Sequence, residues 1–271
     1  MKTINPSELS PMQVQMILQT AVSPRPIALA STIDKNGNVN LSPFSFFNLF
    51  SSNPPILIFS PARRVRDNST KDTLHNVLEV PEVVIGNVNF DMVQQVSLSS
   101  TEYETGVDEF IKSGLTKKPS ELVKPPLIAE SPVNFECKVI EVKPLGNEGG
   151  AGNLVICEVL KIHIKEEFLN EEGNLDQKKL DLVSRLGGNW YGRTSAETLF
   201  EVPKPLVTKG IGFDQLPSEI RNSKIFTGND LGMLANVEQL PEGNFSADEN
   251  LHLEAQKLLL EGKIEEAWKV L

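Results

Sequence analysis

Two apolar segments that flank a tight turn near the N-terminus constrain the fold of this chain more than any other feature. Residues 25–33 alternate between two faces, and residues 39–47 form an apolar return arm. The turn between them contains Asn36-Gly37, a pair that tolerates the positive φ angles of a tight hairpin turn. A third apolar stretch follows over residues 56–60. The pattern predicts short strands joined by hairpins.

Two longer segments in the middle of the chain extend this pattern. Residues 133–142 and 154–164 both alternate with period two, and the glycine-rich loop 146–152 joins them as an antiparallel hairpin. Single helices, among them residues 71–79, interrupt the strands. This order predicts a mainly β fold, an antiparallel barrel that carries added helices.

The character of the sequence changes after Arg193. We expect a barrel domain over residues 1–200 and an irregular, helical C-terminal extension over residues 201–271. Residues 246–271 carry an apolar stripe and could form two short helices around Gly262. An isolated helix of this length is marginal in water. We therefore expect this segment to pack on the barrel or on a neighbouring subunit, without contacting a cofactor.

Charge and composition exclude several classes of protein. The net charge is −10, whereas nucleic acids and anionic membranes call for a basic face. The N-terminus shows no apolar run of a signal peptide, and no stretch approaches a membrane span, so we expect a cytoplasmic protein. Cys137 and Cys157 lie in strand-like segments and indicate buried thiols, with a disulfide as the alternative. Three widely spaced histidines make a metal site improbable.

Small polar groups on the apolar strands and a cationic turn after them indicate a ligand. Hydroxyl and amide side chains along residues 23–60 suit a flat heteroaromatic molecule that needs many hydrogen bonds. The turn Ser69-Thr70-Lys71-Asp72-Thr73 opens a helix, and helix N-termini offer free N–H groups to a phosphate. A ligand with both parts is flavin mononucleotide (FMN), which we infer here. Neither a Walker phosphate loop nor a Gly-x-Gly-x-x-Gly dinucleotide fingerprint occurs.

Each of these residues also has a purely structural interpretation. Lys71 and Thr73 could mark an ordinary helix start with Ser69 or Thr70 as N-cap, although three arginines in residues 63–66 favour a phosphate. Arg25 stands between two prolines and could meet the phosphate or a carboxylate. Asn48 could contact a flavin edge or cap a turn, and Phe47 could stack on the ring or belong to the core.

Seven motifs in the expected order resemble the flavin reductase-like, FMN-binding split-barrel family, flavoredoxin branch. The resemblance covers about residues 23–193, with the tail from about residue 199 outside it. The basic loop 63–68 is longer than that family's pattern. The motifs are Ser-Pro-Arg-Pro-Ile-Ala (23–28), Ser-Phe-Phe-Asn (45–48), Lys-Asp-Thr-Leu-His-Asn (71–76), Asp-Glu-Phe with Gly-Leu-Thr (108–116), Glu-Ser-Pro-Val (130–133), Glu-Cys-Lys (136–138) and Arg-Leu-Gly-Gly-Asn-Trp-Tyr-Gly-Arg (185–193).

The resemblance implies a six-stranded antiparallel split barrel that forms a homodimer and binds FMN near the subunit interface. Ser31 and Thr32 match strand-end positions that reach the flavin, and Phe47 and Asn48 match the segment that lines its ring. The residues 71–73 match the phosphate-side motif. The candidate cofactor-binding residues are therefore Arg25, Ser31, Thr32, Phe47, Asn48, Ser60, Lys71, Asp72 and Thr73.

The sequence as a whole predicts an FMN-dependent oxidoreductase. It would pass electrons between NADH, NADPH or a protein donor and the flavin or an acceptor, while the cofactor carries the chemistry. No catalytic acid or base stands out. His163 matches a recurring family histidine and could touch the flavin or serve the structure alone. The rival interpretations are another FMN-dependent oxidation and a flavin-binding carrier, sensor or interaction protein without turnover.

Overall fold

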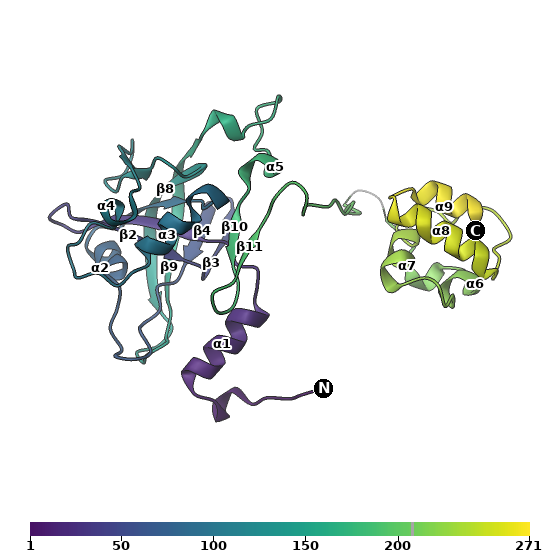
Figure 1. Ribbon diagram of the computed structural model, residues 1–271, viewed down its shortest axis with the longest axis horizontal. Coiled ribbons are helices and arrows are strands. Elements are labelled where there is room, and N and C mark those ends of the chain that lie inside the picture. The colour runs from purple at the N-terminus through teal and green to yellow at the C-terminus, as the bar shows by residue number, and fades with distance from the viewer. Residues whose placement is uncertain (207–208) are drawn as a thin grey trace. The chain divides into compact units, whose positions relative to one another are not determined.

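The computed structural model describes residues 1–206 and 209–271, and residues 207 and 208 of the expected extension lie outside the described residues. The chain divides into two compact units, Met1–Leu199 and Phe200–Leu271 (Figure 1). The first unit is built on a large antiparallel sheet, whereas the second unit is helical.

The main sheet of the first unit has seven strands, each antiparallel to its neighbours, in the order β2-β1-β5-β8-β9-β4-β3. The edge strands β2 and β3 follow one another in the chain, separated by only Ser45 and Phe46. Since so short a connection spans roughly 11 Å at most, the sheet curls until its edges approach, as in a split barrel. The strands are β1 (Ala28–Ile33), β2 (Val39–Phe44), β3 (Phe47–Ser52), β4 (Pro55–Phe59), β5 (Glu82–Gly86), β8 (Val133–Pro144) and β9 (Asn153–Ile164).

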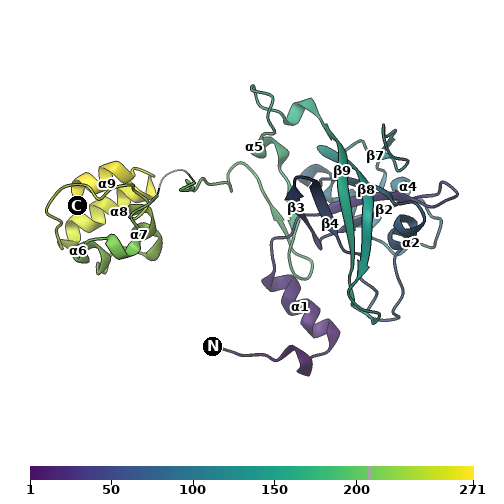
Figure 2. The ribbon, with the colours of Figure 1, turned by 180° about the vertical axis from the view of Figure 1, so that it is seen from behind.

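The expected fold class is confirmed, with one difference in detail. The sequence predicts a single return arm over residues 39–47, but the chain bends after Phe44 and starts a separate strand, β3, at Phe47. Strand β3 pairs with β4, so the sheet has seven strands where the resemblance implies six. Strands β8 and β9 form a long hairpin (Figure 2). Its register shifts show a bulge on each strand.

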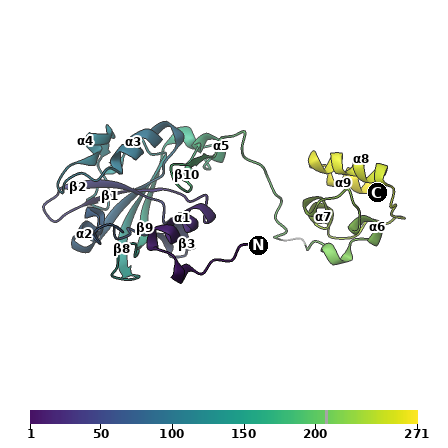
Figure 3. The ribbon, with the colours of Figure 1, turned by 60° about the horizontal axis from the view of Figure 1, so that its bottom comes forward.

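Helices cover both faces of strand β1, all of whose residues are buried. One core cluster joins Ala28 and Ala30 to Leu74 of α2, and another joins Leu29 to Met92 and Phe110 beside α3 and α4 (Figure 3). The remaining elements of this unit are η1 (Pro6–Glu8), α1 (Pro11–Ala21), α2 (Asp72–Glu79), η2 (Phe90–Met92), α3 (Val93–Ser99), α4 (Glu109–Ser113), β6 (Lys117–Lys118), β7 (Leu127–Ile128), η3 (Glu166–Phe168), α5 (Gln177–Leu180), β10 (Val183–Arg185) and β11 (Tyr191–Arg193).

Helix α1 is an element that the sequence analysis missed. Its start carries a clear local signal, because Ser10 and Gln13 form a capping box and Pro11 occupies the first turn. The helix has no buried residue, and Met12, Met16 and Leu18 are all more than half exposed. It stands away from the sheet (Figure 1). Apolar side chains all round the helix blur the 3.6-residue stripe by which a surface helix is recognised.

The second unit has its own hydrophobic core. The two helices expected around Gly262 are α8 (Glu249–Leu260) and α9 (Ile264–Val270), and their apolar stripe includes Leu259 and Trp268. The stripe is buried against Ile220 and Leu234 of the same unit. The expectation that the barrel or another subunit must cover it is therefore wrong, because residues 213–234 supply the missing partners. Those partners are η4 (Phe213–Gln215), α6 (Ser218–Arg221) and α7 (Gly228–Leu234).

The two cysteines are free and buried in the barrel core. Burial raises the pKa of the Cys137 thiol to about 12 and also raises that of Cys157, so both thiols are unreactive. The disulfide alternative is wrong for this structure. Among residues 1–206 and 209–271, no helix is both long and apolar enough to span a membrane.

Candidate functional site

A polar cavity of about 260 Å³ lies where helix α2 begins. Lys71 is the N-cap of α2, and its side chain makes no capping hydrogen bond with the first-turn N–H groups. The Lys71 Nζ donates to Ser42 Oγ of β2 at 3.1 Å and lies 5.2 Å from the centre of the Phe44 ring. The cavity thus combines an ammonium group, hydroxyl groups and the positive end of a helix dipole. Its lining also holds four carboxylates, those of Asp72, Glu102, Glu104 and Glu109.

Arg64 is the second cation of this cavity. Its Nη1 donates to Ser69 Oγ at 2.8 Å and to the Thr70 carbonyl at 3.0 Å, so it holds the turn that leads into α2. Burial lowers the pKa of Lys71, and the nearby Arg64 lowers it further. The two cations therefore repel each other across the cavity, and an anionic ligand would relieve that repulsion.

A buried network fixes the start of α2 to the sheet. The Thr73 hydroxyl donates to Asn40 Oδ1 at 2.7 Å, and Asn40 Nδ2 donates to Glu109 Oε1 at 2.8 Å. The Leu41 N–H donates to the other Glu109 oxygen at 2.9 Å. Burial raises the pKa of the Glu109 carboxyl in spite of these donors. Thr73 is therefore positioned by the network, and its hydroxyl already donates its only proton to Asn40.

The sequence-predicted residues on strand β1 lie in the core rather than on either cavity described in this section. Ser31 and Thr32 are fully buried. Thr32 Oγ1 accepts from Asn76 Nδ2 at 3.1 Å, whereas Ser31 Oγ has no hydrogen-bond partner within the described residues. Asp72, by contrast, lines the polar cavity and accepts from Thr105 Oγ1 at 3.3 Å. The structure thus brings together residues 71–73 but not the two β1 hydroxyls.

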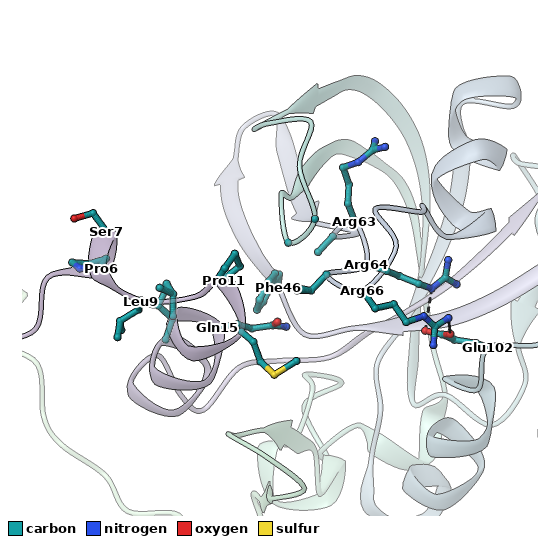
Figure 4. A pocket seen from close by; sticks show the side chains of 17 residues that line it. Pro6, Ser7, Leu9, Pro11, Gln15, Phe46, Arg63, Arg64, Arg66 and Glu102 are labelled. Atoms are coloured by element: carbon teal, nitrogen blue, oxygen red, sulfur yellow. Dashed lines mark hydrogen bonds and ion pairs between the residues drawn. The ribbon is translucent and has the colours of Figure 1, made fainter.

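A larger cavity of about 880 Å³ lies between α1 and the basic loop (Figure 4). Apolar side chains of Leu9, Met12 and Leu18 line one side. Phe46 lies between α1 and the arginines, which form the other side. The lining of this cavity shares Arg64 and Glu102 with that of the polar cavity, so the two adjoin.

Phe46 faces this cavity from the bend between β2 and β3, whereas Phe47 is the first residue of strand β3. Phe47 packs against the barrel core. Asn48 is exposed on edge strand β3, where its Oδ1 accepts from the Leu49 N–H at 2.8 Å. Ser60 is buried beside Gly152, at which a Cβ atom would lie 2.6 Å from the Ser60 Oγ.

The Arg25 guanidinium donates hydrogen bonds to backbone carbonyl groups of other elements. Its Nη1 donates to the Val22 carbonyl at the end of α1, at 2.6 Å, and its Nη2 donates to the Leu186 carbonyl at 3.0 Å. Burial, and to a smaller extent Arg185, lower the pKa of this guanidinium. Arg25 thus connects α1 to the β10–β11 hairpin and lines neither cavity.

His163 belongs to a separate buried cluster. Its Nε2 lies 2.6 Å from Glu136 Oε1, and the Glu136 carboxylate also accepts backbone N–H groups of residues 121, 122 and 123. Burial opposes ionisation of Glu136, but these donors outweigh it and lower the pKa of the carboxyl. The pairing indicates a structural role for His163 beside Glu136, whose carboxylate holds the loop of residues 121–123 on the sheet.

Comparison with known proteins identifies the family. Residues 21–181, more than half of the chain's 271 residues, match the flavin reductase like domain. The chain belongs to the flavin reductase-like family. Solved structures that share the fold of this flavin reductase-like chain include flavoredoxins.

Three relatives show how far this likeness extends. An uncharacterized protein of Halalkalibacterium halodurans is 38% identical over 208 residues, which cover 76% of this chain and 98% of the relative. Nitrilotriacetate monooxygenase component B from Bacillus cereus matches with a TM-score of 0.68 and 28% identity, covering 75% of this chain and 98% of that one. The 2-nitrobenzoate 2-nitroreductase NbaA of Pseudomonas fluorescens matches with a TM-score of 0.66 and 26% identity, covering 80% and 99%. The second unit lies outside the family match.

Sequence analysis missed several residues that line these cavities, chiefly Ser42, Phe46, Glu102, Glu109 and the apolar side of α1. A signal existed for α1 in its capping box. Glu109 lies in the Asp-Glu-Phe motif, although it was not chosen as a site residue, and no local signal marks Glu102. Only the tertiary structure brings Glu102 to Arg64 and Glu109 to Asn40. Within the part of the chain that the structure describes, no cluster of three or more His, Cys, Asp or Glu side chains could hold a metal ion.

Proposed function

We propose that the protein is an FMN-dependent oxidoreductase of the flavin reductase type. It would pass electrons between a reduced nicotinamide or protein donor and the bound flavin or an acceptor. The observation that carries the proposal is the pair of adjoining cavities, one polar with Lys71 and Arg64 at the start of α2, the other largely apolar, which share Arg64.

The residues present fit the two parts of FMN. Lys71, Arg64 and the uncapped N–H groups of α2 would hold the phosphate, for which charge-assisted hydrogen bonds are strong. Phe46 and the apolar side chains of α1 would surround the flat ring. The larger cavity, at about 880 Å³, has the size of a typical small-molecule site. The affinity for the phosphate group would then depend on the two cations. The affinity for the flat ring would depend on the apolar side chains that line the larger cavity.

The flavin supplies the electron transfer when it is bound, and the chain supplies orientation and shelter from water. The cationic end would orient the ligand by its phosphate. The apolar side of α1 would exclude water from one face of the cavity, and Phe46 would present its ring there. No side chain lining either cavity has to donate or accept a proton for this role.

The nature of the donor is part of the proposal. The names of the two solved relatives, a monooxygenase component and a nitroreductase, support redox chemistry. NADH and NADPH are the proposed small-molecule donors, and we propose that the protein is cytoplasmic. A flavin-binding carrier or sensor without turnover is the rival function.

An absorption spectrum of the purified protein, recorded before and after addition of NADH or NADPH under anaerobic conditions, tests this function. We expect the visible bands of an oxidised flavin, and their bleaching by one of the two nicotinamides. Bound flavin that neither nicotinamide reduces would favour the carrier or a protein donor. A protein that binds no FMN would contradict the proposal.

We also propose a homodimer in solution. Leu160, Ile162 and Ile164 alternate along the end of β9, and each is more than a third exposed. Edge strand β3 exposes Leu49 and Phe50. Exposed apolar side chains in such number support an interface, and two-fold dimers are the commonest oligomers. Light scattering that finds a monomer with FMN still bound would contradict it.

A further inference from the structure

We propose that Glu102 occupies the anion position beside the cations of the polar cavity and that a phosphate-bearing ligand must displace it. This inference rests on the proposed function, because the ligand is the phosphate group of the flavin. Glu102 would thereby lower the affinity of the site for phosphate groups in general and set how strongly FMN is preferred over riboflavin.

The position of the Glu102 carboxylate supports this role. Its Oε1 accepts from Arg64 Nε at 3.0 Å, and its Oε2 pairs with Arg66 Nη2. The carboxylate thus bridges two guanidinium groups, which is how an oxygen-rich anion is usually bound by arginines. Figure 4 shows Arg64 and Arg66 converging on Glu102 at the end of the cavity away from α1.

Arg64 links Glu102 to the phosphate-side turn. One edge of its guanidinium holds Ser69 and Thr70 at the start of α2, while its Nε faces Glu102. The charge of Glu102 also reaches Lys71, since it opposes the fall in the Lys71 pKa that burial and Arg64 cause. Glu102 therefore neutralises the same cations that a phosphate would need.

The ion pairs that Glu102 forms with Arg64 and Arg66 are also weak enough for a ligand to displace Glu102. The side chains of Glu102 and Arg66 are 44% and 68% exposed, so water and salt screen their attraction. Glu102 comes from the segment between α3 and α4 and lines both cavities. A phosphate has more charge and more acceptor oxygens than a carboxylate, and it would compete for Arg64 directly.

The test compares Glu102→Gln with a matched control, Glu104→Gln. Glu104 lines the same polar cavity and loses the same charge, but it forms no ion pair among the described residues. Titrations followed by flavin fluorescence would measure the affinity for FMN and for riboflavin. We expect Glu102→Gln to tighten FMN binding about three- to tenfold, with riboflavin unchanged. Glu104→Gln should change FMN affinity less than twofold, a value at the limit of such titrations.

Three results would overturn the inference. Weaker FMN binding by a folded Glu102→Gln variant would mean that Glu102 holds the arginines in place for the ligand. Equal tightening by both variants would show an effect of net charge alone. Calorimetric titration with inorganic pyrophosphate separates this inference from the proposed function, because it needs no flavin. Tighter pyrophosphate binding by Glu102→Gln would support the inference even if FMN failed to bind, and equal binding would contradict it.

Discussion

The cluster around Lys71 and the cluster around His163 both place a basic side chain near a buried carboxylate. They differ in how fully their polar groups are hydrogen-bonded inside the protein. At His163, the Glu136 carboxylate accepts four donors inside the protein. At Lys71, the ammonium donates to a single hydroxyl on the wall of a cavity. A satisfied buried group stabilises the fold, whereas a partly satisfied cation on a cavity is available to a ligand.

Removing the carboxylate of the satisfied cluster should give the largest effect. Glu136→Ala leaves three backbone N–H groups and His163 without their acceptor, and an unsatisfied buried donor costs about 1–3 kcal/mol. We expect a loss of at least about 2 kcal/mol in the free energy of unfolding, measured by urea denaturation. His163→Ala should cost less, because the backbone donors keep their acceptor. A Glu136→Ala variant of unchanged stability would contradict the structural role of this cluster.

Removing the cation of the open cluster should change binding rather than folding. Lys71→Ala should weaken FMN by about ten- to a hundredfold, the worth of a charge-assisted contact. Riboflavin affinity should be nearly unchanged, since riboflavin has no phosphate, and stability should fall little because burial already disfavours the ammonium. Fluorescence titration with both ligands checks this expectation. Equal losses for the two ligands would remove Lys71 from the phosphate site.

The lowered pKa of Lys71 predicts that FMN binding depends on pH. As pH rises through this lowered value, the free protein loses the charge before an ordinary lysine would at 10.5. FMN affinity should therefore fall in the alkaline range, below pH 10.5. Titrations from about pH 7 to about pH 10 should show this fall in the wild type. Lys71→Arg should bind with a flat profile, because arginine stays charged, and a fall of equal size there would contradict the assignment.

The smallest effect is expected from removing the second unit. A chain that ends at Leu199 keeps both cavities, all of whose lining residues belong to the first unit. FMN affinity should change less than about twofold, a difference near zero in free energy. A chain cut after Asn244 should expose the apolar residues of the second core and aggregate more readily. Loss of FMN from a folded Leu199-ended protein would show that the second unit contributes to the site.

The strand pattern of the barrel could be predicted from the sequence. The roles of its polar residues could be predicted only in part. Period-two alternation and the Asn36-Gly37 turn specify strands and hairpins locally, and the hairpin β8–β9 follows from them. The alternation of apolar and polar residues along a strand does not reveal which face of the strand a helix will cover. Strand β1 is covered on both faces, so Ser31 and Thr32 are buried although their polarity suggested a ligand.

By itself, the sequence determined the antiparallel barrel, its family, the start of helix α2 at Lys71 and the helical character of the C-terminal unit. These features depend on local periodicity, turn residues and motif order. All three are set by residues that lie close together in the sequence. Only the tertiary structure decided that Arg25 serves the backbone, that His163 pairs with Glu136, and that Glu102 meets Arg64. Such contacts join residues far apart in the chain, and no local pattern encodes them because each depends on how the sheet curls and where its helices pack.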